Sequence, residues 1–325
     1  MIYLTGCGAA MSLSLNGAWI ASLAALPAAA LIALRCRALH ARGRHASRIA
    51  CLLLSAVLLF CAIYALGATA AFTGQTLLDQ VHTAWSAAIG VFFAALCALS
   101  GEKGVSRLSF SCRFILPGLL LALVALALPG NTPDGLFPLL GTGGTPLLAA
   151  ALCMFCGVAP ALMLLLPPPE LEDSAAAQQN TLPDVRFFLL RVLAGAGAGA
   201  LFLFLACICT TYESIAERSD WGIRLFLLAA HQPHRGLLQM ALTLLQLCAM
   251  ALLAGNMLCA AHRALALAQK KKKQSRTLLV PLVLLLFAGA LTFTALGDTW
   301  LIWSAPLLAI PAALLLILPG KGEKT

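Results

Sequence analysis

The chain has 325 residues, of which 61% are hydrophobic and only 10% are charged, and its net charge is +9. A soluble domain carries about 25% charged residues, so this composition argues against a soluble protein. It predicts an all-α, polytopic transmembrane helix bundle. Because the basic residues lie beside apolar stretches, they predict orientation in a membrane and contact with anionic lipid headgroups, and no nucleic acid is expected as a partner.

Nine apolar stretches alternate with polar loops along the chain. A helix needs about 20 mainly apolar residues to cross a hydrocarbon core roughly 30 Å thick. Six stretches are strongly apolar and three are weaker, so eight crossings stay an alternative to nine. We expect one integral membrane domain over residues 1–325. The expected spans are 14–34, 49–71, 82–100, 114–130, 136–166, 186–210, 236–261, 277–297 and 299–319.

The basic residues are distributed unevenly between the two sides of these spans. Eighteen of the 21 Lys and Arg lie in every second loop and in the C-terminal tail. By the positive-inside rule, this predicts an external N-terminus and a cytoplasmic C-terminus. The densest basic clusters are Arg35–Arg48 and Arg263–Arg276. We expect a multi-pass protein of the bacterial inner membrane.

Three segments depart from simple alternation of helix and loop. Glycines and Pro146 between residues 141 and 146 predict a fifth span that is unwound or begins late near its outer end. Such backbone either dips into the headgroups or lines a cavity. Residues 211–235 predict a helix lying in the membrane interface. Residues 167–184 are rich in proline and acidic side chains, which predicts a flexible cytoplasmic linker.

Cysteines and glycines inside the expected spans are interpreted as packing residues and not as reactive or metal-binding ones. Most of the 12 cysteines fall in apolar stretches, where a free thiol behaves as a small hydrophobe. Cys153 and Cys156 have the spacing of a redox or metal motif, but no second pair supports it, so packing is the favoured interpretation. The glycines between residues 195 and 199 predict close approach of another helix, either within the bundle or between two copies.

Polar residues gather near the outer ends of two expected spans. They are Gln75, Asp79 and His82 before the third span, and His231 and His234 before the seventh. A quinol site needs hydrogen-bond partners and a base, and a neutral histidine beside a carboxylate supplies both. The alternative is that all five are ordinary loop residues at the headgroup level.

Other chemistry has little support in the sequence. No ionisable residue lies near the middle of any span, which argues against ion-coupled transport. The six histidines offer neither facing pairs inside the spans for haem nor a zinc-binding pair within one helix. We therefore expect no catalytic residue, no metal site and no directly bound cofactor in this chain.

Span order and loop character over most of the chain resemble the membrane anchor subunit of the dimethyl sulfoxide reductase family. The likeness lies in the basic loop that leads into residues 48–54, in Thr145–Leu147 followed by Phe155–Gly157, and in the late run 284–290. The resemblance implies an anchor that holds an iron–sulfur electron-transfer subunit and a molybdopterin catalytic subunit on the membrane. It also implies menaquinol as the electron donor.

The sharper motifs of that family are altered here. The family's His-Leu-Gly-x-Pro after the second span is represented by residues 72–76, where only Gly74 matches. Its serine–tryptophan motif ending in glutamate is reduced to Trp85 and Ser86 followed by alanine, and Ala290 replaces an acidic residue. The family's quinol-binding residues therefore do not carry over. The alternatives are a small-solute transporter built round the glycine-rich fifth span and a structural membrane protein without a site.

Overall fold

The computed structural model describes five helices and some positions outside them. The described residues are 48–76, 83–101, 143–158, 235–269 and 278–296, together with 104, 107, 162 and scattered positions in 17–34 and 190–205. This part of the chain is all-helical and contains no strand. The expected spans 114–130 and 299–319, the interfacial segment before Arg235 and the linker 167–184 lie outside the described residues.

The five helices fall on five of the expected spans. They are α3 (Arg48–Thr76), α4 (Thr83–Leu99), α6 (Gly144–Val158), α10 (Arg235–Ala268) and α11 (Leu279–Leu296). Among the described residues, two helical stretches are long and apolar enough to cross a membrane, Arg48–Gly67 in α3 and Leu247–Ala268 in α10. Helices α4 and α11 are shorter and equally apolar in character. The number of crossings in the whole chain stays a prediction.

A break lies near the glycines of the fifth span, as expected, at Gly143, and residues 136–142 before it lie outside the described residues. Helix α6 begins at Gly144, and Gly143 before it has φ of 123°, a backbone conformation that glycine adopts without strain. The amide of Leu147 donates to the carbonyl of Gly143 at 3.1 Å, which closes the first helical turn. Pro146 lies inside that turn, where its missing N–H has no helical acceptor to lose.

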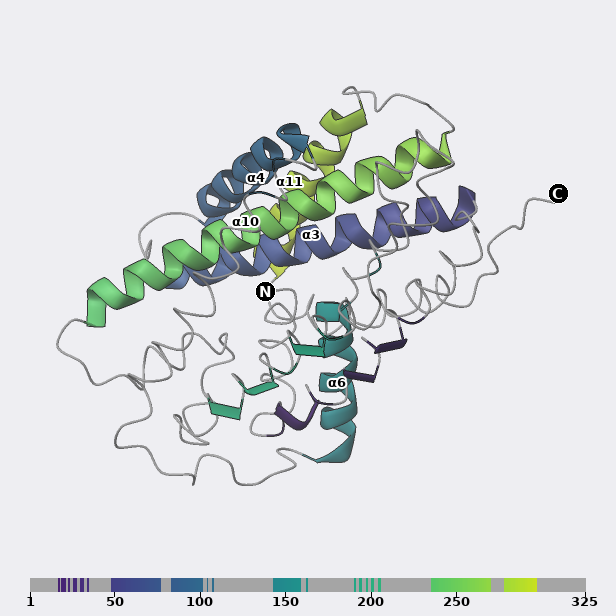
Figure 1. Cartoon of the computed structure of the whole chain (residues 1–325). Helices are drawn as coiled ribbons and strands as arrows, with labels where there is room; N and C mark the ends of the chain where they lie inside the picture. Colours follow the sequence, from purple (N-terminus) through teal and green to yellow (C-terminus); the bar gives the residue numbers. More distant parts are fainter. Residues whose placement is uncertain are drawn as a thin grey trace.

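Helices α3, α4, α10 and α11 form one packed group, whereas α6 stands apart from them and crosses their direction in the view of Figure 1. The most extensive contact joins α3 and α10, which lie side by side and run in opposite directions (Figure 1). Helices α4 and α11 contact each other and lie on the same side of this central pair. The group therefore has two layers.

Single glycines set the register between the two layers. A Cβ at Gly255 of α10 would lie 2.6 Å from Cβ of Cys97, and Cys259 one turn later donates from Sγ to the carbonyl of Ala98 at 3.4 Å. Residue numbers rise together on the two helices, so α4 and α10 are parallel.

The same pattern relates α3 and α11. A Cβ at Gly289 would lie 2.5 Å from Cδ1 of Ile63, and one at Gly67 would lie 2.5 Å from Cγ of Phe293. The rings of Phe293 and Tyr64 meet edge to face with centroids 5.6 Å apart. Helices α3 and α11 are therefore parallel as well, and glycine lets each parallel pair approach closely.

These directions make two inverted hairpins. Since α3 opposes α10, and α10 is parallel to α4, helices α3 and α4 are antiparallel, and so are α10 and α11. A two-fold axis between α3 and α10 would exchange α3 with α10 and α4 with α11. It would also exchange the two parallel contacts, α3 with α11 and α4 with α10, and both are present. The two hairpins are not equivalent, however, because α3 contacts α4 much more extensively than α10 contacts α11.

Two packing expectations have different outcomes. Cys51 and Cys61 are buried, as expected of small hydrophobes, whereas the side chains of Cys153 and Cys156 lie outside the described residues. The close approach expected at the glycine run is absent at Gly197, where an added Cβ would meet nothing within 4 Å. Close packing depends on which residue faces the glycine, and a run of small residues does not specify that partner.

Candidate functional site

The five candidate quinol residues flank described helices without being described themselves. Gln75 lies in the last turn of α3, although its side chain is not described. Asp79, His82, His231 and His234 lie outside the described residues. What the structure gives is the position of the helix ends to which they are attached.

Three of those helix ends lie at the same end of the four-helix group. Helix α3 ends at Thr76, α4 begins at Thr83 and α10 begins at Arg235. Because α3 is antiparallel to both α4 and α10, its last residue and their first residues share one end (Figure 1). Gln75 is therefore at this end, and the other four candidates are attached to it within about four residues along the chain.

The candidate residues separate into two levels along the helix axes. Arg235 precedes Gly255 by 20 residues, whereas Thr83 precedes Ala94, which faces Gly255, by 11 residues. At a rise of 1.5 Å per residue, this difference of nine residues places the start of α10 about 14 Å farther along the helix axes than the start of α4. The attachment point of His234 is thus displaced outwards from that of His82.

Ser86 is a polar residue at this end that sequence reasoning did not select. It lies in the first turn of α4, its exposed fraction is 2%, and its Oγ makes no hydrogen bond in the structure. Other hydroxyls in the group bond to the preceding turn, as Thr69 does to the carbonyl of Ala65 at 2.6 Å. A buried hydroxyl without a partner costs about 1–3 kcal/mol, so Ser86 is a buried polar atom that needs an explanation.

The opposite end of the group gathers cations. Helix α3 starts with Arg48 there, and the last turns of α10 carry His262 and Arg263. The expected span ended at residue 261, and Arg263 was expected in the loop. Instead, α10 continues to Ala268 and Arg263 is only 6% exposed. None of the described residues is Asp or Glu, so this end is basic throughout the described part of the chain.

No group of three or more His, Cys, Asp or Glu that could hold a metal ion occurs among the described residues. No protein-family model matches the chain, and no curated protein matches it significantly.

Proposed function

We propose that the chain is a bacterial inner-membrane protein of nine spans with an external N-terminus and a cytoplasmic C-terminus. The directions of α3, α4, α10 and α11 agree with those this topology requires of its second, third, seventh and eighth spans. Because α4 and α10 run the same way, an odd number of crossings must separate them if both span the bilayer. The three spans proposed between them satisfy this condition.

We further propose that the protein is the membrane anchor subunit of a molybdopterin-type respiratory oxidoreductase. The sequence resemblance motivates this role. The observation that carries it furthest is that the exposed Arg48 at the start of α3 lies at the same end as the C-terminus of α10, which leads along the chain into Lys270–Arg276. A cationic surface at this end would suit an acidic partner. The iron–sulfur subunit would dock there through Arg35–Arg48 and Lys270–Arg276 if the catalytic subunits are cytoplasmic, and the catalytic subunit would bind through it. Docking on the outer side is the alternative, and it is the arrangement in which electrons pass directly from a quinol at the outer end to an iron–sulfur cluster, since no electron carrier is proposed inside this chain.

The other end of the helix group would take the quinol. Gln75, Asp79 and His82 are attached at the level where α4 begins, so the carboxylate and imidazole can accept the two protons. The buried hydroxyl of Ser86 lies one turn deeper and can bond a quinol oxygen. His231 and His234 are attached farther out, which suits them to passing protons to solvent. Menaquinol is the proposed donor.

Purification of the tagged full chain in mild detergent tests the anchor role. The expected result is co-purification of a protein with several four-cysteine cluster motifs and of a second, larger subunit, identified by mass spectrometry. Elemental analysis should find iron and molybdenum in the same fractions. The control is a parallel purification from cells that lack the tag. A homogeneous chain without iron or molybdenum counts against the proposal.

A second candidate function is small-solute transport, which the inverted hairpins favour. Many secondary transporters contain repeats of inverted topology, with the substrate site at the interface between them. Here α3 and α10 form such an interface, and Tyr64 and Thr69 are buried polar residues on α3. The absence of Asp and Glu from the described residues argues against ion coupling and leaves facilitated diffusion as the mechanism.

Reconstitution of the full chain in proteoliposomes separates the two functions. For a transporter, a panel of labelled sugars, amino acids and nucleobases should show saturable uptake that unlabelled solute inside accelerates. Protein-free vesicles are the control. Uptake of one solute class by the chain alone supports transport, whereas no uptake together with co-purified iron supports the anchor.

A further inference from the structure

The outward face of α4 carries its large side chains, and its buried face carries its small ones. The exposed residues are Trp85, Ile89, Phe92, Phe93, Leu96 and Leu99. The buried residues are Ser86, Ala87, Gly90, Val91, Ala94 and Ala98. This order is the reverse of that in a soluble protein, whose core takes the large apolar residues.

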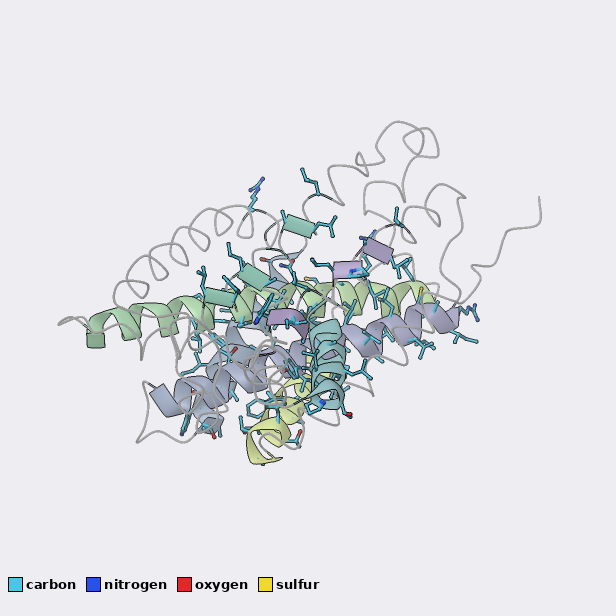
Figure 2. The ribbon with its side chains drawn as sticks, turned by 90° about the horizontal axis from the view of Figure 1, so that it is seen from below. Atoms are coloured by element: carbon cyan, nitrogen blue, oxygen red, sulfur yellow. The ribbon has the colours of Figure 1, made fainter. Side chains whose placement is uncertain are left out.

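Helix α11 extends this surface. Val280, Leu284 and Leu285 are each more than half exposed. Side chains on the outer sides of α4 and α11 project away from the other helices (Figure 2). We call these three residues and the six exposed residues of α4 the α4–α11 outer face. Its two helices have 17 and 18 residues, about 26 Å at 1.5 Å per residue, close to the thickness of a bilayer's hydrocarbon core.

We infer that the α4–α11 outer face contacts the acyl chains of the bilayer and is not covered by another protein or a second copy. This rests on the proposed membrane location and adds which surface meets lipid. Helices that pack together in membranes present small residues to each other, as the buried side of α4 does with Gly90 and Ala94. The exposed residues of α4 are all bulky, whereas the exposed side of α11 also includes Ala288, Thr292 and Ala295. The α4 side of this face therefore suits acyl chains better than close packing against another helix.

Trp85 strengthens the choice of lipid. It is 66% exposed and lies in the first turn of α4, at the end of the apolar stripe. Tryptophan is enriched where the bilayer core meets the headgroups, because its ring is apolar and its indole N–H hydrogen-bonds. The other five exposed residues of α4 named above carry no polar side-chain atom. Partner subunits would therefore bind elsewhere than at this face.

Quenching by brominated lipid tests the inference. The full chain is placed in nanodiscs of phosphatidylcholine with brominated acyl chains, and the fluorescence of its five tryptophans is compared with that in unbrominated discs. Trp85→Phe should remove a large part of the quenchable emission, and adding Phe92→Trp to that variant should restore it. Trp19→Phe is the control, because the Trp19 indole nitrogen is buried and its ring packs on Phe204.

The outcomes separate this inference from the proposed function. Equal quenching in wild type and Trp85→Phe, with no gain from Phe92→Trp, overturns the inference, since a protein surface then covers the face. Sodium carbonate extraction of native membranes is measured in parallel. A chain that carbonate releases is not integral, and that result overturns both the inference and the membrane location. If the chain stays in the membrane fraction after carbonate treatment but Trp85 is not quenched by brominated lipid, only the inference is overturned.

Discussion

At the scale of single residues, three glycines decide how closely the helices pack. Gly67, Gly255 and Gly289 each face a side chain that would lie under 3.0 Å from an added Cβ, whereas Gly197 faces nothing within 4 Å. The neighbours differ in how easily they can move. Cδ1 of Ile63 can turn away from Gly289, but Cγ1 and Cγ2 of Ile63 would also lie within 2.9 Å and move only with χ1, which a helix restricts. Cβ of Cys97 and the backbone carbonyl of Ala94 beside Gly255 cannot turn away at all.

Gly255→Ala should therefore destabilise the protein by about 1–3 kcal/mol, as overpacking of a close contact does. Gly289→Ala should also destabilise it, because Cγ1 and Cγ2 of Ile63 lie under 3.0 Å from the added Cβ and χ1 of a helical isoleucine is restricted. Gly197→Ala is the matched control and should leave stability unchanged or raise it slightly, since alanine is the better helix former. The measurement is the midpoint of thermal unfolding in one detergent. Equal midpoints for Gly255→Ala and Gly197→Ala contradict the α4–α10 contact.

Ser86 gives the second prediction at this scale. Ser86→Ala removes a buried hydroxyl that makes no hydrogen bond, so the free energy of unfolding should stay the same or rise. If the hydroxyl bonds quinol, KM for quinol should rise at the same time. Thr69→Val is the control, since the Thr69 hydroxyl already bonds the carbonyl of Ala65. A Ser86→Ala variant with unchanged KM rules out the proposed contact.

His82 and Asp79 give the third prediction at this scale. His82→Ala should slow quinol-dependent reduction of the iron–sulfur partner by up to about a hundred-fold if His82 is the only general base. Asp79→Asn should slow it less, because Asp79 would act by orienting the imidazole. Protein level and assembly should stay normal. Wild-type rates in both variants contradict a role for His82 and Asp79 and leave His231 and His234 as the candidate proton acceptors.

At the scale of elements, the sequence predicted the position of a helix wherever polar residues flank an apolar stretch. Span 82–100 was expected and α4 covers Thr83–Leu99, ending before Gly101, whose φ of 73° suits a helix terminus. The expected seventh span ended seven residues before α10 does. His262 and Arg263 look like loop residues in sequence, but neighbouring helices bury both, and burial is a property of the fold.

The sequence predicted the candidate site less completely than it predicted the helices. A serine in a helix is expected to bond the preceding turn, so the free hydroxyl of Ser86 gives no local signal. The difference in level between the starts of α4 and α10 also depends on their packing register, which Gly255 sets from the middle of α10. Sequence spacing alone grouped all five polar candidates together.

The basic loops give the prediction at this scale. Reversing Lys270–Lys273 to glutamate should release the iron–sulfur partner at about 0.15 M salt, where screening already weakens the contact. Reversal of Lys321 and Lys324 in the C-terminal tail is the control. Arg263 is not used, because it is buried and its replacement would disturb the helix group. Topology must be checked in each variant, and full retention of the partner argues against docking at this loop.

At the scale of the whole molecule, the inverted hairpins connect packing with topology. Two helical hairpins in one membrane have the same orientation, with their first helices running the same way, when no crossing or an even number of crossings separates them. The hairpins α3–α4 and α10–α11 have opposite orientations, so the chain between them must cross an odd number of times if all four helices span the bilayer. Basic residue counts support the same conclusion independently, since they place the start of α3 and the end of α10 on one side.

The last prediction tests that agreement with reporter fusions. A reporter active only in the cytoplasm should work when fused after Ser100 or at Thr325, and should fail at Asp134 and directly before Arg235. The positions after Ser100 and before Arg235 test the parallel directions of α4 and α10, whereas Asp134 and Thr325 test the distribution of basic residues. A periplasmic reporter at the same four sites is the control and should give the reverse pattern. The position after Ser100 marks the end of α4, and the position before Arg235 marks the start of α10. Two helices that run parallel through one bilayer have the end of one and the start of the other on opposite faces. Reporters that place both positions on the same face therefore contradict the odd number of crossings.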